Sequence, residues 1–292
     1  MAWATDTTDD PHRILFIGGL HRSGTTPVAR WIAQHPDVSA FEGTHAAEDE
    51  GQHLQDVYPA ASRHGGPGRF ALDDNAHLTE SSSLVSETAR ECIWDAWSPY
   101  WDLERPVLVE KSPPNLIRTR FLQALFPRES HFLVVIRHPI AVAYATRRWT
   151  RRSSMVPRPA ARRLVSLQAP IGHLLEHWVA AHERFIDDAS RLERVRLIRY
   201  EDVVADTARE LAAIFRFIGL QPIDGRWQVK TGLNRAYIER WESWRHSLGG
   251  RRAVRRLYRD FEPRVRRFGY SLREPEETYA PALDLDRYLA TR

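Results

Sequence analysis

A short stretch near the N-terminus has the residue types of an anion-binding loop. The apolar residues 14–17 lead into residues 18–26, GGLHRSGTT, and a helical pattern follows. Glycines let the backbone turn with its amides pointing inward, and the N-terminus of the next helix adds partial positive charge. Hydroxyl groups and the Arg22 guanidinium add side-chain donors around the same small volume. The sequence therefore predicts a site for phosphate or a similar anion.

The loop departs from the Walker pattern at one position. The spacing of Gly19 and Gly24 fits the start of G-x-x-x-x-G-K-[ST], but Thr25 stands where the lysine would be. Nucleoside triphosphate enzymes also need an acidic residue at a strand end to help hold Mg²⁺. The one acid in a suitable place, Glu110, is followed by Lys111, which would compete with a metal cation. We therefore expect no metal and favour a group transfer in which protein cations take the role of Mg²⁺.

Strand and helix patterns alternate along most of the chain, which indicates a parallel sheet with right-handed crossovers. Ligands of such sheets bind outside the carboxyl ends of the strands. We expect a three-layer, P-loop-like α/β fold with a central parallel sheet flanked by helices, in which Arg22, Lys111 and Arg137 meet at one edge. Strands are expected over residues 13–18, 38–41, 106–110, 131–136 and 195–200, and helices over 24–34, 84–97, 115–126, 139–150, 171–191, 205–218, 234–244 and 251–268.

One domain accounts for most of the chain. Its 292 residues, 42% of them hydrophobic, lie near the upper size for a single core. We expect a flexible polar tail at residues 1–12 and a single domain at residues 13–292. Residues 43–105 show little periodicity and form an insertion. A long excursion after a nucleotide loop commonly serves as a lid or an acceptor-binding element.

Composition limits the compartment and the partners. Cys92 is the only cysteine, so neither an internal disulfide nor a cysteine-based metal site is expected. No signal peptide and no apolar stretch of about 18 residues is evident. The arginine groups at residues 147–163 and 245–267 are interleaved with acids, which is typical of solvated helix faces rather than nucleic-acid binding. We expect a cytoplasmic protein that binds neither membranes nor nucleic acids.

Several of these segments resemble sulfotransferases that use 3'-phosphoadenosine 5'-phosphosulfate (PAPS). The similarity implies transfer of the sulfuryl group from PAPS to a hydroxyl by metal-free in-line displacement, which leaves 3'-phosphoadenosine 5'-phosphate (PAP). The motifs are most similar to the carbohydrate and tyrosylprotein branch. The matching runs are residues 19–26 (the 5'-phosphosulfate loop), 110–113 (EKSP, a second-strand motif), 135–139 (VIRHP, the 3'-phosphate motif), 200–203 (YEDV) and 268–270 (FGY).

The resemblance implies a role for individual residues. Lys111 would lie near the bridging oxygen, where a compact ammonium stabilises the leaving phosphate, and Arg22 would assist it. Arg137 would bind the 3'-phosphate with two hydrogen bonds. The 5'-phosphosulfate would be held by Arg22, Ser23, Gly24, Thr25 and Thr26.

Three further cofactor contacts follow from the same resemblance. The family usually has a serine eight residues after the 3'-phosphate arginine, where this chain has Ala145 followed by Thr146. Either Thr146 or Arg147 compensates, or the 3'-phosphate is held more weakly. Tyr200 would contact the 3'-phosphate or the adenosine, and Lys230 belongs to a segment similar to the late cofactor-covering one.

An acceptor hydroxyl loses its proton as it attacks sulfur, so a general base is expected. Residues 35–42 resemble a segment of carbohydrate and tyrosylprotein sulfotransferases in which a glutamate at about this position is the base, which implies Glu42. His45, Glu48 and His53 lie close enough in the sequence to be alternatives. The acceptor stays open between a carbohydrate, a natural product and a peptide tyrosine.

Two other functions compete with sulfuryl transfer. One is a Mg²⁺-dependent P-loop kinase of a small molecule, which would lose its reaction without divalent metal. The other is a non-catalytic module that binds a nucleotide or a polyanion, with steeply salt-dependent binding and no turnover.

Overall fold

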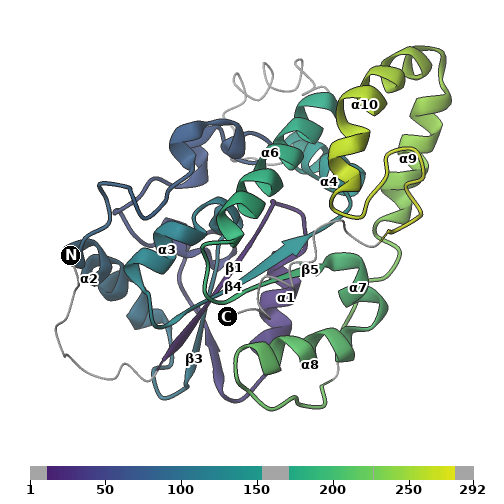
Figure 1. Cartoon of the computed structure of the whole chain (residues 1–292). Helices are drawn as coiled ribbons and strands as arrows, with labels where there is room; N and C mark the ends of the chain where they lie inside the picture. Colours follow the sequence, from purple (N-terminus) through teal and green to yellow (C-terminus); the bar gives the residue numbers. More distant parts are fainter. Residues whose placement is uncertain (1–11, 153–170, 226, 280–292) are drawn as a thin grey trace.

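The computed structural model describes residues 12–152, 171–225 and 227–279, and these residues form a parallel sheet covered by helices on both faces (Figure 1). The tail expected at residues 1–12 lies outside the described residues except for His12, whose Nε2 is 2.8 Å from the carbonyl oxygen of Leu103. The expected α/β fold is confirmed. The sheet order is β2-β3-β1-β4-β5, with β1 (Arg13–Gly19), β2 (Val38–Ala40), β3 (Val107–Lys111), β4 (Ser130–Ile136) and β5 (Val195–Arg199).

The register of the strands aligns their carboxyl ends. Every described pair is parallel, and Ile17 of β1 lies opposite Lys111 of β3, while Gly19 lies opposite Val135 of β4. Lys111 is therefore level with Ile17, two residues before the end of β1, and Arg137 comes two residues after the partner of Gly19.

Alternate residues of each strand bury opposite faces of the sheet. In β1, Ile14 and Phe16 belong to the core cluster that includes α2, α3, α6 and the insertion, and Leu15 and Ile17 belong to the cluster that includes α1 and α8. Burial on both faces explains why the strands are nearly continuous apolar runs.

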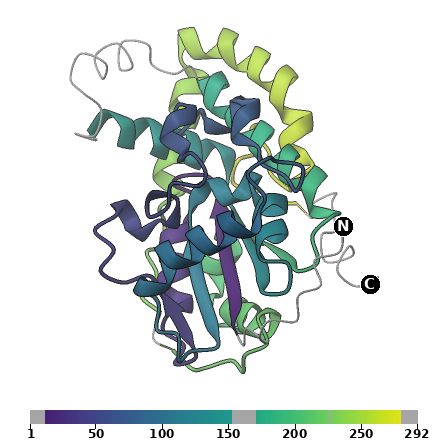
Figure 2. The ribbon, with the colours of Figure 1, turned by 90° about the vertical axis from the view of Figure 1, so that its left-hand side faces the viewer.

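The helices follow the predicted pattern with small shifts. Figures 1 and 2 place α9 and α10 beside α4 and α6, beyond the carboxyl ends of the strands. The described helices are α1 (Thr25–Ile32), α2 (Glu87–Trp97), α3 (Thr119–Leu125), α4 (Pro139–Arg152), α6 (Ile171–Ala189), α7 (Tyr200–Ala205), α8 (Thr207–Phe217), α9 (Arg235–His246) and α10 (Leu248–Arg266).

Two predicted boundaries were wrong. Tyr200 begins α7 instead of ending a strand, and the helix expected over residues 115–126 is divided into a 3-10 helix, Pro113–Ile117, and α3. Arg118 separates the two with an extended φ of −131°, and its side chain is fully buried.

The insertion is packed onto the core although it has little regular structure. Besides α2, it contains short 3-10 helices, among them Ala47–Asp49, Gly51–His53 and Phe70–Leu72. Trp97 is fully buried and lies 6.3 Å from Phe126, centroid to centroid, in a stacked arrangement. Its indole N–H donates to the carbonyl of Gly51 at 3.0 Å. Aromatic packing thus replaces backbone periodicity as the source of order.

In the part of the chain that the structure describes, we find no helix with the length and apolarity needed to cross a bilayer.

Replacing Trp97 by alanine tests this packing. We expect Trp97→Ala to lower the free energy of unfolding by about 3–5 kcal/mol, because it removes a large buried side chain and leaves a cavity. Urea unfolding measures the loss. Leu248→Ala is the control, since Leu248 is 93% exposed, and should change stability by less than about 0.5 kcal/mol. A loss below about 1 kcal/mol for Trp97→Ala would show that the insertion contributes little to the core.

Candidate active site

The loop after β1 contains two residues with positive φ, Arg22 and Gly24. Gly24 has φ of +103°, and a Cβ at this position would lie 2.3 Å from Cδ2 of Tyr200, so no side chain fits there. Arg22 has a left-handed φ of +73°. The Oγ of Ser23 is buried and has no hydrogen-bond partner among the described residues. A buried hydroxyl without a protein partner is costly, so this one is available to bind a water or a ligand group.

Arg137 joins the end of β4 to this loop. Its Nη1 donates to the carbonyl oxygen of Arg22 at 2.7 Å, and its Nε donates to Oδ1 of Asn234 at 2.8 Å. The guanidinium carbon lies 4.6 Å from the centroid of the Tyr200 ring. The structure therefore brings together four of the residues predicted from the sequence: Arg22, Gly24, Arg137 and Tyr200.

The environment of Arg137 suits an anion. The side chain is 6% exposed, and its Nη2 has no hydrogen-bond partner among the described residues. No ion pair with a carboxylate is found for it in the same residues. Burial lowers its pKa, because desolvation disfavours the charged form. A buried cation with one unsatisfied nitrogen is suited to bind a negatively charged group.

Glu201 fixes the elements around Arg137. Its carboxylate accepts from Nδ2 of Asn234 at 2.6 Å, from the backbone N–H of His138 at 3.0 Å and from the Tyr270 hydroxyl at 2.8 Å. The YEDV and FGY segments, far apart in the chain, thus meet through one carboxylate. Asn234, which orients Arg137, was not among the predicted site residues, although it is the last residue of the segment 229–234 that resembles the late cofactor-covering one.

Lys111 contacts the insertion rather than its neighbour Glu110. It is 5% exposed, and its Nζ donates to the carbonyl oxygen of Glu48 at 2.8 Å and to Oε1 of Glu50 at 3.1 Å. The Oε2 of Glu48 accepts from the Thr26 hydroxyl at 3.4 Å. Residues 48–50 therefore connect the ammonium to the loop after β1.

Three consecutive insertion residues are bonded to three consecutive residues at the end of β3. Glu50 pairs with Lys111, the amide of Gly51 donates to Oε1 of Glu110 at 3.0 Å, and the amide of Gln52 donates to the hydroxyl of Ser112 at 3.1 Å. A Cβ at position 51 would lie 2.6 Å from Oε1 of Glu110, so any side chain there would have to displace this buried carboxylate. We refer to these bonds, between residues 50–52 and 110–112, as the β3 clasp.

A model described as the sulfotransferase family matches residues 15–224. The chain belongs to the sulfotransferase family. This confirms the family that the motifs indicated, whereas the carbohydrate and tyrosylprotein branch stays a prediction. No curated protein matches the chain significantly.

Solved structures of sulfotransferases are similar to this chain at low identity. One, from Alicyclobacillus acidocaldarius, has 17% identity over 80% of this chain and 92% of that chain, with a TM-score of 0.43. The sulfotransferase domain of the Synechococcus PCC 7002 olefin synthase has 18% identity over 83% and 92%, with a TM-score of 0.45. A mouse sulfotransferase complexed with PAP has 14% identity over 82% and 87%, with a TM-score of 0.42.

The four candidates for the general base have different surroundings. Glu42 is exposed, and its backbone N–H donates to the carbonyl of Tyr100 at 3.3 Å. Glu48 contacts Thr26, and Nε2 of His53 lies 3.8 Å from Oε2 of Glu50. His45 is exposed and has a left-handed φ of +59°. Glu50, the acid that pairs with Lys111, was not among the candidates.

Two further cofactor candidates lie apart from these contacts. Thr146 is buried on α4, where it lines a small pocket with Leu20 and His21. Ala145, at the position of the family serine, is buried as well. Lys230 is exposed in the segment before α9, and we find no side-chain bond from it to another described residue. The roles expected for Thr146 and Lys230 stay predictions.

No group of three or more His, Cys, Asp or Glu side chains is placed to hold a metal ion within the described ranges.

Titration of Glu110 gives the β3 clasp a testable pH dependence. Burial raises the pKa of Glu110 to about 7, and bonds from Ser112 and Asn115 offset this only in part. The native state then holds this proton more tightly than the unfolded state. The resulting stabilisation is complete below about pH 4.5 and is lost as the pH rises through about 7.

We therefore expect Glu110→Gln, which is neutral at every pH, to remove part of the pH dependence of stability. Between pH 5 and 8, the wild type should lose up to about 3 kcal/mol relative to this variant. Denaturant unfolding at a series of pH values measures the difference. Glu104→Gln changes an exposed glutamate and should follow the wild type. If the free energy of unfolding of the wild type and of Glu110→Gln changed with pH in parallel, the raised pKa of Glu110 would be contradicted.

Proposed function

We propose that this sulfotransferase transfers the sulfuryl group of PAPS to the hydroxyl of an acceptor. The observation that carries the proposal is the pair of buried cations, Arg137 and Lys111, at strand ends on either side of the loop after β1. The unpartnered Nη2 of Arg137 and Oγ of Ser23 fit phosphate oxygens of this cofactor. Family membership supports the same activity.

Each residue then has a role that its surroundings allow. Arg137 binds the 3'-phosphate, and Tyr200 supports its guanidinium through the face of the ring. The 5'-phosphosulfate, which supplies the activated sulfuryl group, is held by backbone amides and by Arg22, Ser23, Gly24, Thr25 and Thr26. Lys230 covers the cofactor, and Thr146 takes part in holding its 3'-phosphate.

Lys111 has one hydrogen available for the reaction. An ammonium carries three donors, and two of them are directed at Glu48 and Glu50. The third is free to donate to the oxygen that bridges sulfur and phosphorus, where negative charge develops as the bond breaks. Because Glu48 and Glu50 orient the ammonium beforehand, little reorganisation is needed during transfer.

The base that accepts the hydroxyl proton comes from the start of the insertion. Glu42 stays the candidate that the family resemblance implies. Glu48 is the alternative that its contacts favour, because its carboxylate already lies against Thr26 of the phosphosulfate loop. No metal is required in this scheme, and the expected cytoplasmic location is unchanged.

Titration with PAP in EDTA tests the cofactor class. We expect PAP to bind the wild type, and Arg137→Ala to weaken binding more than tenfold, or about 1.4 kcal/mol, because the variant loses the 3'-phosphate contact. Isothermal titration calorimetry measures both affinities. Arg256→Ala is the matched control, since Arg256 is exposed on α10 and pairs with Asp260 on the surface.

Three outcomes separate the competing functions. Binding of ATP with Mg²⁺, and none of PAP without metal, would replace the proposal by the kinase. Binding that weakens steeply with salt, together with no release of PAP from PAPS, would favour the non-catalytic module. Equal PAP affinity for wild type and Arg137→Ala would remove Arg137 from the cofactor site.

A further inference from the structure

Positive charge is concentrated in one pair of helices. We refer to residues 235–267, which comprise α9, α10, the residue between them and the residue after them, as the α9–α10 hairpin. The hairpin contains eleven arginines, no lysine and four acidic residues, so its net charge is +7. The whole chain has 42 basic and 38 acidic residues, and its net charge is only +4. The remainder of the chain therefore has three more acids than bases.

Both ends of the hairpin lie at the site proposed for the cofactor. Asn234, directly before α9, accepts a hydrogen bond from Nε of Arg137 at 2.8 Å. Tyr270, three residues after the hairpin, donates its hydroxyl to Glu201 at 2.8 Å. In Figures 1 and 2 the hairpin extends outward beyond the carboxyl ends of the strands. Its charge is thus held next to the opening at which a ligand of the sheet arrives.

Three arginines of the hairpin are exposed and unbonded. Arg240, Arg252 and Arg255 have neither a hydrogen bond nor an ion pair to any residue that the structure describes. The nearby acids Glu239 and Asp260 pair with other arginines of the hairpin. Solvated charges of this kind contribute little to stability. They do add to the electrostatic potential around the molecule, which acts on charged ligands before any contact forms.

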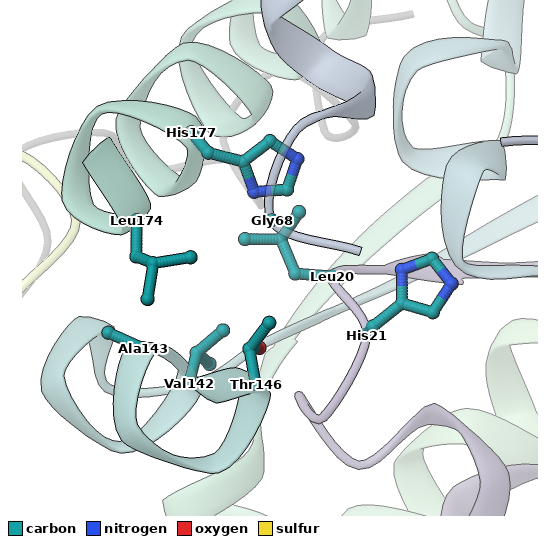
Figure 3. A pocket seen from close by; sticks show the side chains of 8 residues that line it. All are labelled: Leu20, His21, Gly68, Val142, Ala143, Thr146, Leu174 and His177. Carbon is teal, nitrogen blue, oxygen red and sulfur yellow. The ribbon is translucent and has the colours of Figure 1, made fainter. Parts of the chain in front are cut away.

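The residues that line the site add little net charge. The ammonium of Lys111 is paired with Glu50 at 3.1 Å. The small pocket beside the loop after β1 is lined by uncharged side chains, two of them imidazoles (Figure 3). Burial lowers the pKa of His21 to about 3 and that of His177 well below its ordinary value, so both are neutral near pH 7. The hairpin therefore supplies positive charge that the lining of the site does not.

We infer that the α9–α10 hairpin attracts the anionic cofactor through its long-range field and so speeds its association, with no contact from Arg240, Arg252 or Arg255. PAP carries two phosphate groups, each with a charge of about −1.5 to −2 at pH 7. A patch of one sign beside a binding site raises the association rate of a ligand of opposite sign, and salt weakens this effect. The inference rests on the proposed use of PAPS and concerns how that cofactor reaches its site.

The size of the hairpin fixes the salt range in which this field acts. The twelve residues of α9 span about 18 Å at 1.5 Å per residue. This length is shorter than the Debye length at about 0.01 M salt, roughly 30 Å, and longer than the roughly 8 Å at physiological ionic strength. Arginines far along the hairpin therefore act on the cofactor mainly at low salt.

Stopped-flow association of the fluorescent analogue etheno-PAP tests the inference. The triple variant Arg240→Glu, Arg252→Glu, Arg255→Glu changes the charge of the hairpin from +7 to +1. We expect its association rate constant to be about five- to tenfold below that of the wild type at about 0.02 M salt, and within about twofold of it at about 0.5 M. The dissociation rate constant should stay the same, because no contact with the ligand is lost.

A matched triple variant changes the charge equally at the opposite edge of the sheet. Arg30 and Arg216 are exposed in the last turns of α1 and α8, and Arg128 is exposed two residues before β4. These positions lie toward the amino ends of the strands, away from the cofactor site. Replacing all three by glutamate should change the association rate constant by less than about twofold at about 0.02 M salt.

Replacing Arg240, Arg252 and Arg255 by glutamine keeps the test decisive if the glutamate variant folds poorly, and should slow association by about half as much on a logarithmic scale. Unchanged association, faster dissociation, or an equal effect of the control variant would overturn the inference. In each of these cases PAP still binds, so the proposed function stands. Absence of PAP binding to the wild type would overturn the proposed function and this inference with it.

Discussion

The bond between the Gly51 amide and the buried carboxylate of Glu110 determines where the insertion meets the sheet. From this point, Glu50 reaches Lys111 on one side and Gln52 reaches Ser112 on the other. Lys111 would otherwise be a long, mobile side chain at a strand end. The same contact brings Glu48 to Thr26, so the ammonium and the loop after β1 are connected through a segment that belongs to neither strand. A single buried carboxylate, which accepts the hydrogen bond from Gly51, thus organises residues from three parts of the chain.

A second carboxylate has the corresponding role on the other half of the site. Glu201 holds the end of β4, the start of α9 and Tyr270 together. Asn234, which donates to Glu201, in turn accepts a hydrogen bond from Arg137 and so fixes its guanidinium. Neither Glu110 nor Glu201 is needed as a reactant in the proposed chemistry. Their function is to keep two cations in place before a ligand arrives, so that the site forms with little loss of conformational entropy when it binds.

Most of the sheet could be predicted from the sequence because each strand is an apolar run buried on both faces. Arg22 and Arg137 were also predictable, since residues next to parallel strand ends must meet at one edge. The partners of the cations were not, because they come from distant segments: Glu50 is 61 residues from Lys111, and Asn234 is 97 residues from Arg137. The insertion has no period that could have revealed its placement. Its order comes from aromatic packing around Trp97, which only the folded structure displays.

The close approach of Gly24 to Tyr200 makes two distant segments depend on each other. A Cβ at position 24 would lie 2.3 Å from Cδ2 of Tyr200, and the ring of Tyr200 lies 4.6 Å from the guanidinium carbon of Arg137. Any side chain at position 24 would therefore displace the ring that supports this cation. A substitution in the loop after β1 would in this way disturb the end of β4 without changing any charge.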